Sequence, residues 1–405
     1  MSLVKFIYQF SVWAYRLGIG IAAPFNAKAA DWISGRKDWQ SRLPQPKTKT
    51  RYWFHCASLG EFEQARPLIE HYAHQDIEIC LSFFSPSGYN QKKEYSHAVW
   101  VGYLPLDSKR NAQVLLDALQ PDKVFFVKYE FWYAYLKEIH NRQIPFYLIS
   151  ARLRQEQPFF QWYGGVYREM LRFYSHIYTQ DKASVDLLQG IGIKHVTHAG
   201  DTRFDRVLNL KQAKAENAIL ADFIQNRTCL VAGSSWPLEE ELIAKAYVKF
   251  PEMCWVIVPH NISESHIAEI EKRFENTLRY SSLEKRKDAA PSRVLIIDRI
   301  GLLGNAYSYA DMALVGGGFT NALHNILEAA VWGIPVLYGN NTPKYPEGEA
   351  LANFGGGIRL ANQADFDSVL SELQDTSKRR EIGAKAGQWI EAHAGATRRI
   401  LASIQ

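Results

Sequence analysis

Short apolar runs alternate with amphipathic segments along most of this chain, and this alternation limits the folds open to it. From Arg51 onward the apolar runs have the length of buried strands, and stretches with helical spacing separate them. Strands that alternate with helices form parallel sheets, which bind ligands at the carboxyl ends of the strands. The sequence therefore predicts an α/β protein. One series of strands is expected at 52–57, 78–84, 98–103, 123–127, 145–150 and 177–179, and a second at 229–232, 254–258, 294–297, 312–315 and 335–338.

A chain of 405 residues is too long for one ordinary domain, so each series of strands predicts a domain of its own. We expect two Rossmann-like domains that face a cleft. The expected divisions are a membrane-associated helix and basic segment at 1–44, a first domain at 45–205, a polar helical linker at 206–228, a second domain at 229–375, and C-terminal helices at 376–405 that close the second domain or cross back to the first.

The charge and the cysteines exclude some classes of protein. A formal net charge of +5 is modest, which argues against a general nucleic-acid binder and is compatible with an anionic substrate or a membrane surface. The cysteines lie in strand-like runs without a C-x-x-C motif: Cys56, Cys80, Cys229 and Cys254. They are expected to be buried reduced thiols of a cytosolic protein, neither disulfides nor zinc ligands.

Residues 3–25 are apolar apart from Lys5, Gln9 and Arg16. On a helix, at about 100° per residue, those polar side chains share one narrow face, and another face carries Phe6, Phe10, Trp13, Leu17 and Ile21. This segregation favours a helix that lies in the membrane interface; a single transmembrane anchor and a cleaved signal peptide are the alternatives. The basic residues that follow would face anionic lipid: Arg36, Lys37, Arg42, Lys47, Lys49 and Arg51.

The segment Met312–Leu337 contains three consecutive glycines between a predicted strand and a helix expected from about Leu323 to Trp332. Glycines allow a ligand to approach the backbone, and a helix N-terminus offers unpaired N–H groups to an anion. The segment therefore predicts a phosphate-binding turn, although such turns also occur without a ligand in α/β domains. It is neither a dinucleotide fingerprint, because Asn321 stands where the third glycine is needed, nor a P-loop.

On the helix expected after this turn, His324 and Glu328 would lie four residues apart on one face, with Asn325 beside them. A carboxylate in that place could accept hydrogen bonds from both hydroxyls of a ribose whose phosphate lies at the helix tip. The pattern thus favours a nucleotide over other anions.

Several blocks, in this order, resemble the Kdo transferases of lipopolysaccharide synthesis. These enzymes move 3-deoxy-D-manno-octulosonic acid (Kdo) from CMP-Kdo to a lipid A precursor. The resemblance covers nearly the whole chain, and the two blocks HCASLGEFEQA and VKYEFWYAYL are more specific than the glycine turn. The blocks are HCASLGEFEQA (55–65), VKYEFWYAYL (127–136), ISARL (149–153), GDTRFDR (200–206), GSSWPLEEE (233–241) and VGGGFTNALHNILEAA (315–330).

The resemblance implies a GT-B glycosyltransferase whose N-terminal domain binds the acceptor and whose C-terminal domain binds the nucleotide. It implies inverting transfer to lipid IVA at the cytoplasmic face of the inner membrane, with no cofactor. The sequence contains no D-x-D motif that stands out as a metal site, so no metal ion is expected. By similarity, Glu61 is the general base and Glu130 a second essential carboxylate. Glu61 follows a strand end and a Ser-Gly turn, which suits a base in a cleft, although a helix-capping carboxylate would occupy the same position.

Glu130 lies between aromatic residues just after an apolar run, so it is expected either to pair with a cation such as Arg152 or to serve the site. The remaining substrate-binding residues expected from the resemblance are Ser58, Gly60, Arg152, Arg203, Ser234, Ser235, His260, Gly316, Gly317, Gly318, His324, Asn325 and Glu328.

Some positions depart from the family pattern. Arg203 stands where the family usually has lysine, Pro259-His260 where relatives show Pro-Arg-His, and Lys128 where relatives often have glutamate. Two alternatives remain open: another GT-B enzyme that uses a UDP-sugar, as transferase or epimerase, and a membrane-tethered nucleotide-binding protein without catalysis. Two glutamates in one cleft argue against the second alternative, because a scaffold needs no base.

Overall fold

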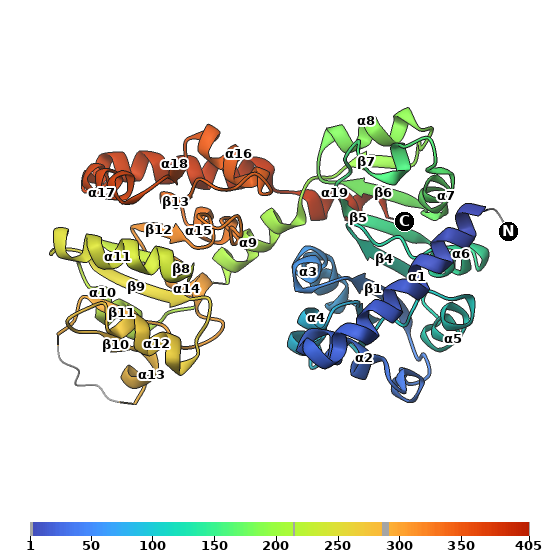
Figure 1. The fold of residues 1–405 in the computed structure, drawn as a ribbon. Helices are drawn as coiled ribbons and strands as arrows, with labels where there is room; N and C mark the ends of the chain where they lie inside the picture. Colours follow the sequence, from blue (N-terminus) through green and yellow to red (C-terminus); the bar gives the residue numbers. More distant parts are fainter. Residues whose placement is uncertain (1–2, 214, 286–290, 405) are drawn as a thin grey trace. The chain divides into compact units, whose positions relative to one another are not determined.

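A computed structural model describes residues 3–213, 215–285 and 291–404 (Figure 1). The chain divides into two compact units. The first unit extends to Arg206 and includes the C-terminal stretch from Ala394, and the second is Val207–His393. Two helices occupy most of the predicted 206–228 segment: α9, Thr202–Gln212, which begins before it, and α10, Ala218–Ile224. The last helix, α19, Ala396–Ser403, belongs to the first unit.

The first unit contains a seven-stranded parallel sheet with the strand order β3-β2-β1-β4-β5-β6-β7. The direction in which the chain adds strands reverses between β1 and β4, and open α/β sheets bind ligands at such a reversal. The strands are β1 Thr50–Cys56, β2 Ile77–Phe83, β3 Trp100–Tyr103, β4 Lys123–Val127, β5 Phe146–Ala151, β6 His176–Thr179 and β7 Val196–His198.

Helices cover both faces of this sheet. They are α1 Leu3–Ala22, α2 Ala27–Arg36, α3 Leu59–Ala73, α4 Pro86–Lys92, α5 Lys109–Leu119, α6 Tyr133–Asn141, α7 Gly165–Phe173, α8 Lys182–Gly190 and α19 Ala396–Ser403, with 3-10 turns at Ala23–Phe25, Trp39–Arg42 and Pro158–Phe160. The boundary between the two units falls within α9, Thr202–Gln212.

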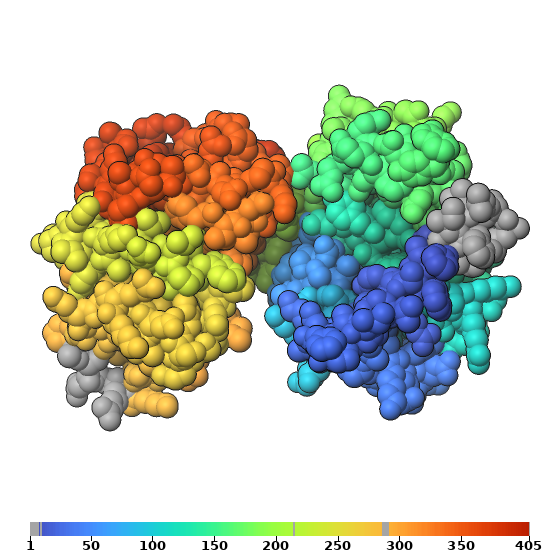
Figure 2. Space-filling model, viewed as in Figure 1, coloured from blue at the N-terminus to red at the C-terminus, as the bar shows by residue number. Residues whose placement is uncertain are grey.

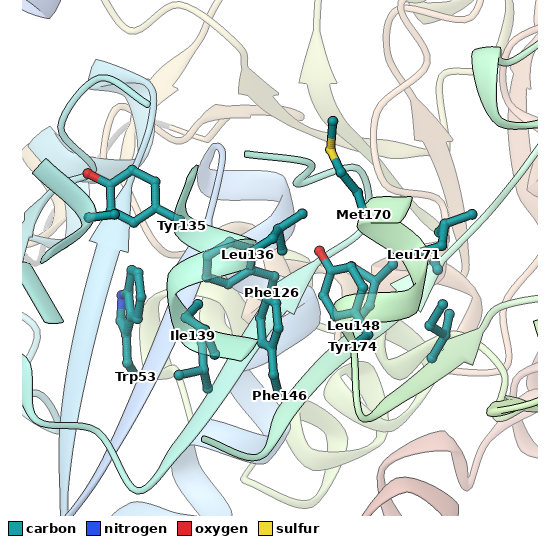
Figure 3. Packing of buried hydrophobic residues seen from close by; sticks show 14 of the residues in the cluster. Trp53, Phe126, Tyr135, Leu136, Ile139, Phe146, Leu148, Met170, Leu171 and Tyr174 are labelled. Atoms are coloured by element: carbon teal, nitrogen blue, oxygen red, sulfur yellow. The ribbon is translucent and has the colours of Figure 1, made fainter. Parts of the chain in front are cut away.

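Alternate residues of the central strands enter different apolar cores, because successive side chains of a strand point to opposite faces of the sheet. Phe54 and Phe125 enter one core and Trp53 and Phe126 the other. Figure 3 shows the second core, where helix residues pack over Phe126, Phe146 and Leu148. His55 has the same parity as Trp53, so its ring lies on the face of this second core.

The second unit contains another seven-stranded parallel sheet, ordered β10-β11-β9-β8-β12-β13-β14, with its reversal between β8 and β12. Its strands are β8 Cys229–Ser235, β9 Cys254–Pro259, β10 Leu278–Arg279, β11 Val294–Ile296, β12 Met312–Val315, β13 Val336–Gly339 and β14 Gly357–Leu360. Its helices are α10 Ala218–Ile224, α11 Pro237–Lys249, α12 Glu264–Glu271, α13 Tyr280–Leu283, α14 Leu303–Tyr307, α15 Leu327–Ala330, α16 Pro346–Phe354, α17 Gln363–Glu372 and α18 Thr376–His393.

The α/β class and every predicted strand are confirmed, and β4 and β12 have the predicted bounds. Strands β7, β10 and β14 were not predicted; they are short and include the edges of both sheets. All four cysteines are buried and free, as expected. Cys229 and Cys254 are paired in register between the neighbouring strands β8 and β9.

Helices α1 and α2 lie on the surface of the first unit (Figure 2, dark blue). Phe10, Trp13, Leu17 and Ile21 are 50–66% exposed, so this part of the predicted apolar face is uncovered. The side chains of Lys5, Phe6 and Gln9 lie outside the described residues. In the described part of the chain, no helix is long and apolar enough to cross a membrane.

The prediction that the whole basic segment faces lipid is wrong. Arg51 is 1% exposed and pairs with Glu78, and Arg36 donates to the carbonyl oxygens of Phe84 and Leu104. These guanidinium groups satisfy buried acceptors and stabilise the fold. Of the other basic residues, Lys47 pairs with Asp122 and Lys49 with Asp76, while Lys37 and Arg42 are exposed.

Candidate active site

The two predicted catalytic glutamates follow the two strands at the reversal of the first sheet. Glu61 lies in the first turn of α3, directly after β1, and Glu130 lies between β4 and α6. β1 and β4 are hydrogen-bonded neighbours, with His55 in register with Phe126. The sheet therefore brings both carboxylates to one edge, as the sequence predicts.

Glu61 is held by contacts to both of its carboxylate oxygens. The hydroxyl of Ser58, which is the N-cap of α3, donates to Oε2, and the same hydroxyl oxygen accepts from the amide of Gly60 at 3.2 Å. Lys128 Nζ lies 3.9 Å from Oε1. The Glu61 side chain keeps 18% of its surface exposed, so it remains accessible, and Ser58 rather than Glu61 caps the helix. Lys128, whose position departs from the family pattern, is thus a neighbour of the candidate base.

Glu130 is 5% exposed, and its carboxylate does not pair with Arg152. Its Oε2 atom lies 2.8 Å from His55 Nε2 and 2.5 Å from Trp132 Nε1, and its backbone oxygen accepts from the hydroxyl of Tyr174. The other side of the His55 ring contacts Ser82, at 2.9 Å from its hydroxyl. The expected arginine partner is therefore replaced by a buried histidine and an indole.

Two arginines, Arg152 and Arg154, lie near enough to the neighbouring Tyr129 for their charges to act on its phenol. Burial raises the pKa of the Tyr129 phenol, and the positive charges of Arg154 and Arg152 oppose that rise. Arg152 lies 3.3 Å from Asp181 and keeps 41% of its side chain exposed. Arg203 was expected to bind an anion of the substrate. Its guanidinium contacts Asp201 of the same unit, with Nε and Nη2 both near Oδ2.

Helices α1 and α2 contact the segment that carries Glu130. The hydroxyl of Tyr8 donates to Asp107 at 2.8 Å and accepts from the amide of Tyr133 at 3.1 Å. The Trp132 ring stacks on Phe84 with 4.7 Å between centroids, and Phe84 packs against Trp32 of α2. The surface helices are therefore part of the framework around Glu130.

In the second unit, the predicted donor-binding residues lie at the end of β8 or after β9 and β12, around the reversal of the second sheet. The glycine turn serves close packing of these strand ends. A Cβ on Gly316 would lie 2.0 Å from the carbonyl oxygen of Ser234, and one on Gly318 would lie 2.5 Å from the amide of Gly339. Gly317 has φ +84°, which favours glycine.

Two features expected of a phosphate cradle at this turn are not found, and phosphate binding there stays a prediction. The amide of Gly316 already donates to Gly233, and the amide of Gly317 donates to the buried carboxylate of Glu239 at 2.9 Å. The expected helix from Leu323 to Trp332 is also reduced to α15, Leu327–Ala330, so no helix dipole begins at the glycines. His324 lies before α15 and does not share a helical face with Glu328.

Three rings gather at this edge: Trp236, His260 and His324. Trp236 stacks on His260 with 4.7 Å between centroids and an interplanar angle of 18°, and its Nε1 donates to His324 Nε2 at 3.1 Å. Burial and the neighbouring His260 lower the pKa of His324 to about 4, so this ring is neutral at physiological pH. His260, which directly follows Pro259, is thus part of this ring stack.

The other predicted donor residues have local partners. Ser235 is buried and donates to Glu240, whereas Ser234 is half-buried and has a left-handed backbone, with φ 50°. Asn325 accepts from the amide of Leu327 and donates to Glu328 at 3.0 Å, which caps α15. In the described ranges, no cluster of metal-ligating side chains is present.

Sequence reasoning missed the partners that hold the two glutamates. His55 and Trp132 belong to quoted blocks but were not assigned to the site, and Ser82 lies in a different strand. Trp236 and Glu239 were also missed. The proline at 237 with a glutamate two residues later is a helix-start signal that could have indicated Glu239 as the capping carboxylate.

Comparison with known proteins finds one family that this chain resembles. Residues 37–206 match the family of 3-deoxy-D-manno-octulosonic-acid transferases (kdotransferases). A 3-deoxy-D-manno-octulosonic acid transferase of Aquifex aeolicus is 27% identical over 84% of this chain and 90% of its own length, and one of Haemophilus influenzae is 25% identical over 86% and 85%. A bifunctional glycosyltransferase/methyltransferase of Fusobacterium nucleatum is 26% identical over 81% of this chain, which spans 53% of that relative.

Solved structures agree on the fold. A UDP-GlcNAc 2-epimerase from Neisseria meningitidis superposes with a TM-score of 0.60 at 17% identity, over 87% of this chain and 99% of that one. MurG of Acinetobacter baumannii superposes with a TM-score of 0.57 at 12% identity, over 88% and 99%. The fold is that of a GT-B protein. With the match over 37–206 and relatives along most of its length, the chain is similar to the Kdo transferases.

Proposed function

We propose that this protein transfers Kdo from CMP-Kdo to a lipid A precursor, lipid IVA, with inversion at the anomeric carbon. The observation that carries the proposal is that Glu61 and Glu130 follow the two strands at the reversal of the first sheet, in a chain similar to the Kdo transferases. Inversion follows from a single displacement, in which the acceptor oxygen attacks from the side opposite the leaving group.

Glu61 is the proposed general base. It takes the proton from a glucosamine hydroxyl, the hydroxyl oxygen forms the bond to the anomeric carbon, and CMP leaves with the bonding electron pair. Ser58 and Lys128 hold the Glu61 carboxylate in place, and the side chain is accessible to an acceptor. Glu130 contacts the sugar beside it. The arginines near Tyr129 suit the phosphate groups of the acceptor.

CMP-Kdo binds at the reversal of the second sheet in this proposal. The stacked Trp236 and His260 rings offer a flat surface suited to a base, and Asn325 and Glu328 suit ribose hydroxyls. The glycine turn supports this surface through close packing. No step calls for a metal ion, so we expect chelators to leave transfer unchanged.

The membrane face is proposed to be the uncovered apolar side of α1. Its exposed aromatic and aliphatic residues would enter the interface of the cytoplasmic leaflet. Because Tyr8 of α1 contacts the segment around Glu130, an acceptor held in that leaflet would arrive near the candidate site. Flotation with anionic vesicles tests this: Trp13→Ser with Leu17→Ser should lose binding, whereas exchange of the exposed Val248 for serine should not.

The reaction is tested by incubating the purified protein with lipid IVA and one donor at a time: CMP-Kdo, UDP-GlcNAc or CMP-sialic acid, with and without EDTA. We expect the mass of lipid IVA to rise by Kdo additions with CMP-Kdo alone, equally in EDTA. Turnover of the UDP-sugar with CMP-Kdo ignored would support the other GT-B activity. Binding of CMP without any product would support the non-catalytic alternative.

A further inference from the structure

The two oxygens of the Glu130 carboxylate have different surroundings. Oε2 contacts both His55 and Trp132, whereas the hydrogen bonds of the described residues include none to Oε1. With 7% of its side-chain surface exposed, Glu130 has one oxygen engaged by the protein and the other open to a ligand.

The partners of Oε2 are themselves fixed. His55 is fully buried in β1, and its ring lies against Phe126, 4.9 Å between centroids, with Nδ1 on Ser82. Trp53 donates to the same Ser82 hydroxyl at 2.8 Å. A hydrogen-bonded row therefore crosses the core face of the sheet from Trp53 to Glu130.

Trp132 is fixed from the opposite direction. Its indole stacks on Phe84, and the Phe84 ring packs edge-on against Trp32 at 5.7 Å. An indole N–H can only donate, so it favours a carboxylate over a neutral acceptor. Because the Trp132 ring is packed in this stack, its N–H points in a fixed direction.

We propose that His55 and Trp132 are positioning residues that hold Oε2 of Glu130 and thereby present Oε1 to the transferred sugar. This inference rests on the proposed function for the identity of the sugar, but the hydrogen bonds can be tested without it. A residue that positions a carboxylate affects turnover more than substrate binding. When the carboxylate is slightly displaced, fewer of the bound substrate molecules are in the geometry that reacts.

The variants are chosen to remove one hydrogen bond each. Trp132→Phe keeps an aromatic ring on Phe84 and loses only the indole N–H. His55→Leu removes the contact to Oε2, whereas the amide nitrogen of His55→Gln can replace Nε2 as a donor. Trp100→Phe is the matched control. It also removes an indole N–H, which donates to the backbone carbonyl oxygen of Arg42 and not to Glu130.

We expect Trp132→Phe and His55→Leu to lower kcat about ten- to a hundred-fold, with KM for both substrates within about threefold of wild type. His55→Gln should retain more activity than His55→Leu, and Trp100→Phe should match wild type. If His55→Leu does not fold, Trp132→Phe and His55→Gln still carry the comparison. Wild-type kcat in Trp132→Phe, or a loss of kcat in Trp100→Phe of the same size, would overturn the proposal.

A second readout does not depend on catalysis. The indole N–H signal of Trp132 in a ¹⁵N-labelled protein, assigned by its loss in Trp132→Phe, should move upfield in Glu130→Gln and stay in place in Glu63→Gln. An unmoved signal would overturn the positioning role. If the signal moves while wild-type protein forms no Kdo product, the proposed function fails and the hydrogen bond stands.

Discussion

The hydroxyl of Tyr8, in the first helix, donates a hydrogen bond to Asp107, which in turn accepts from the backbone amides of Ala134 and Tyr135. Asp107 thus links α1 to the start of α6, directly after the Glu130 segment. Burial raises the pKa of the Asp107 carboxyl to about 6, against the lowering effect of these hydrogen bonds.

This raised pKa predicts a pH dependence of stability. Between about pH 4 and pH 6 the folded protein binds a proton at Asp107 that the unfolded chain has released, so this group's contribution to stability falls as the pH rises. Asp107→Asn removes the titration. The difference in unfolding free energy between wild type and Asp107→Asn should change by about 2–3 kcal/mol from pH 4 to pH 7, to the disadvantage of wild type. Urea unfolding of both proteins measures it; a constant difference would contradict the assignment.

Gly60→Ala is expected to affect stability and substrate binding in different ways. A Cβ at this position would meet only Ser58 Oγ at 3.7 Å, an ordinary contact. Alanine in place of a helical glycine should therefore stabilise the protein by about 0.5–1 kcal/mol. If the acceptor approaches this turn, as we propose, the added methyl group raises KM for lipid IVA. A thermal shift with an unchanged KM would place the acceptor elsewhere.

Gly318→Ala should have the opposite effect on stability. Its Cβ would lie 2.5 Å from the amide nitrogen of Gly339, so the ends of β12 and β13 would have to separate. We expect a loss of about 1–3 kcal/mol in the absence of any ligand. If this variant unfolds like wild type but no longer binds CMP, the glycine serves the ligand and the packing explanation is wrong.

Substitutions of Lys128 test how strongly the activity of Glu61 depends on the positive charge beside it. Its Nζ lies 3.9 Å from Glu61 Oε1 and both side chains are partly exposed, a kind of pair worth about 0–1 kcal/mol. Lys128→Gln should therefore lower kcat/KM less than about fivefold. Lys128→Glu brings a like charge to Glu61 and should cost more than Lys128→Gln. The exposed Lys194→Glu is the control for charge reversal alone; equal losses in both reversals would exclude a local role for Lys128.

The sequence predicted what depends on local pattern. Apolar runs located the central strands, and their ends placed Glu61 and Glu130 at one edge of a sheet. His55 was missed because a single polar residue inside an apolar run gives no local sign of its partners, and Ser82 and Glu130 are 27 and 75 positions away. Pairings of that separation are set by strand register.

The glycine turn shows the other limit. The Ala- and Leu-rich stretch after it indicated a helix, but Asn321 has a left-handed backbone, φ 55°, and Asn325 caps a helix that begins only at Leu327. Asparagine tolerates both conformations, and tertiary contacts decide between them and a helix. The carboxylate of Glu239, 78 positions from Gly317, was likewise beyond local reasoning.

The proposed base role of Glu61 is tested most directly by Glu61→Gln, assayed beside Glu63→Gln. Glu63 lies on the same helix and pairs with Arg66 and Arg206, so its variant controls for loss of a carboxylate in α3. With CMP-Kdo and lipid IVA, read by mass, Glu61→Gln should form product at least about a thousandfold more slowly while its affinity for CMP is unchanged, and Glu63→Gln should remain active. Transfer at the wild-type rate by Glu61→Gln would contradict the account.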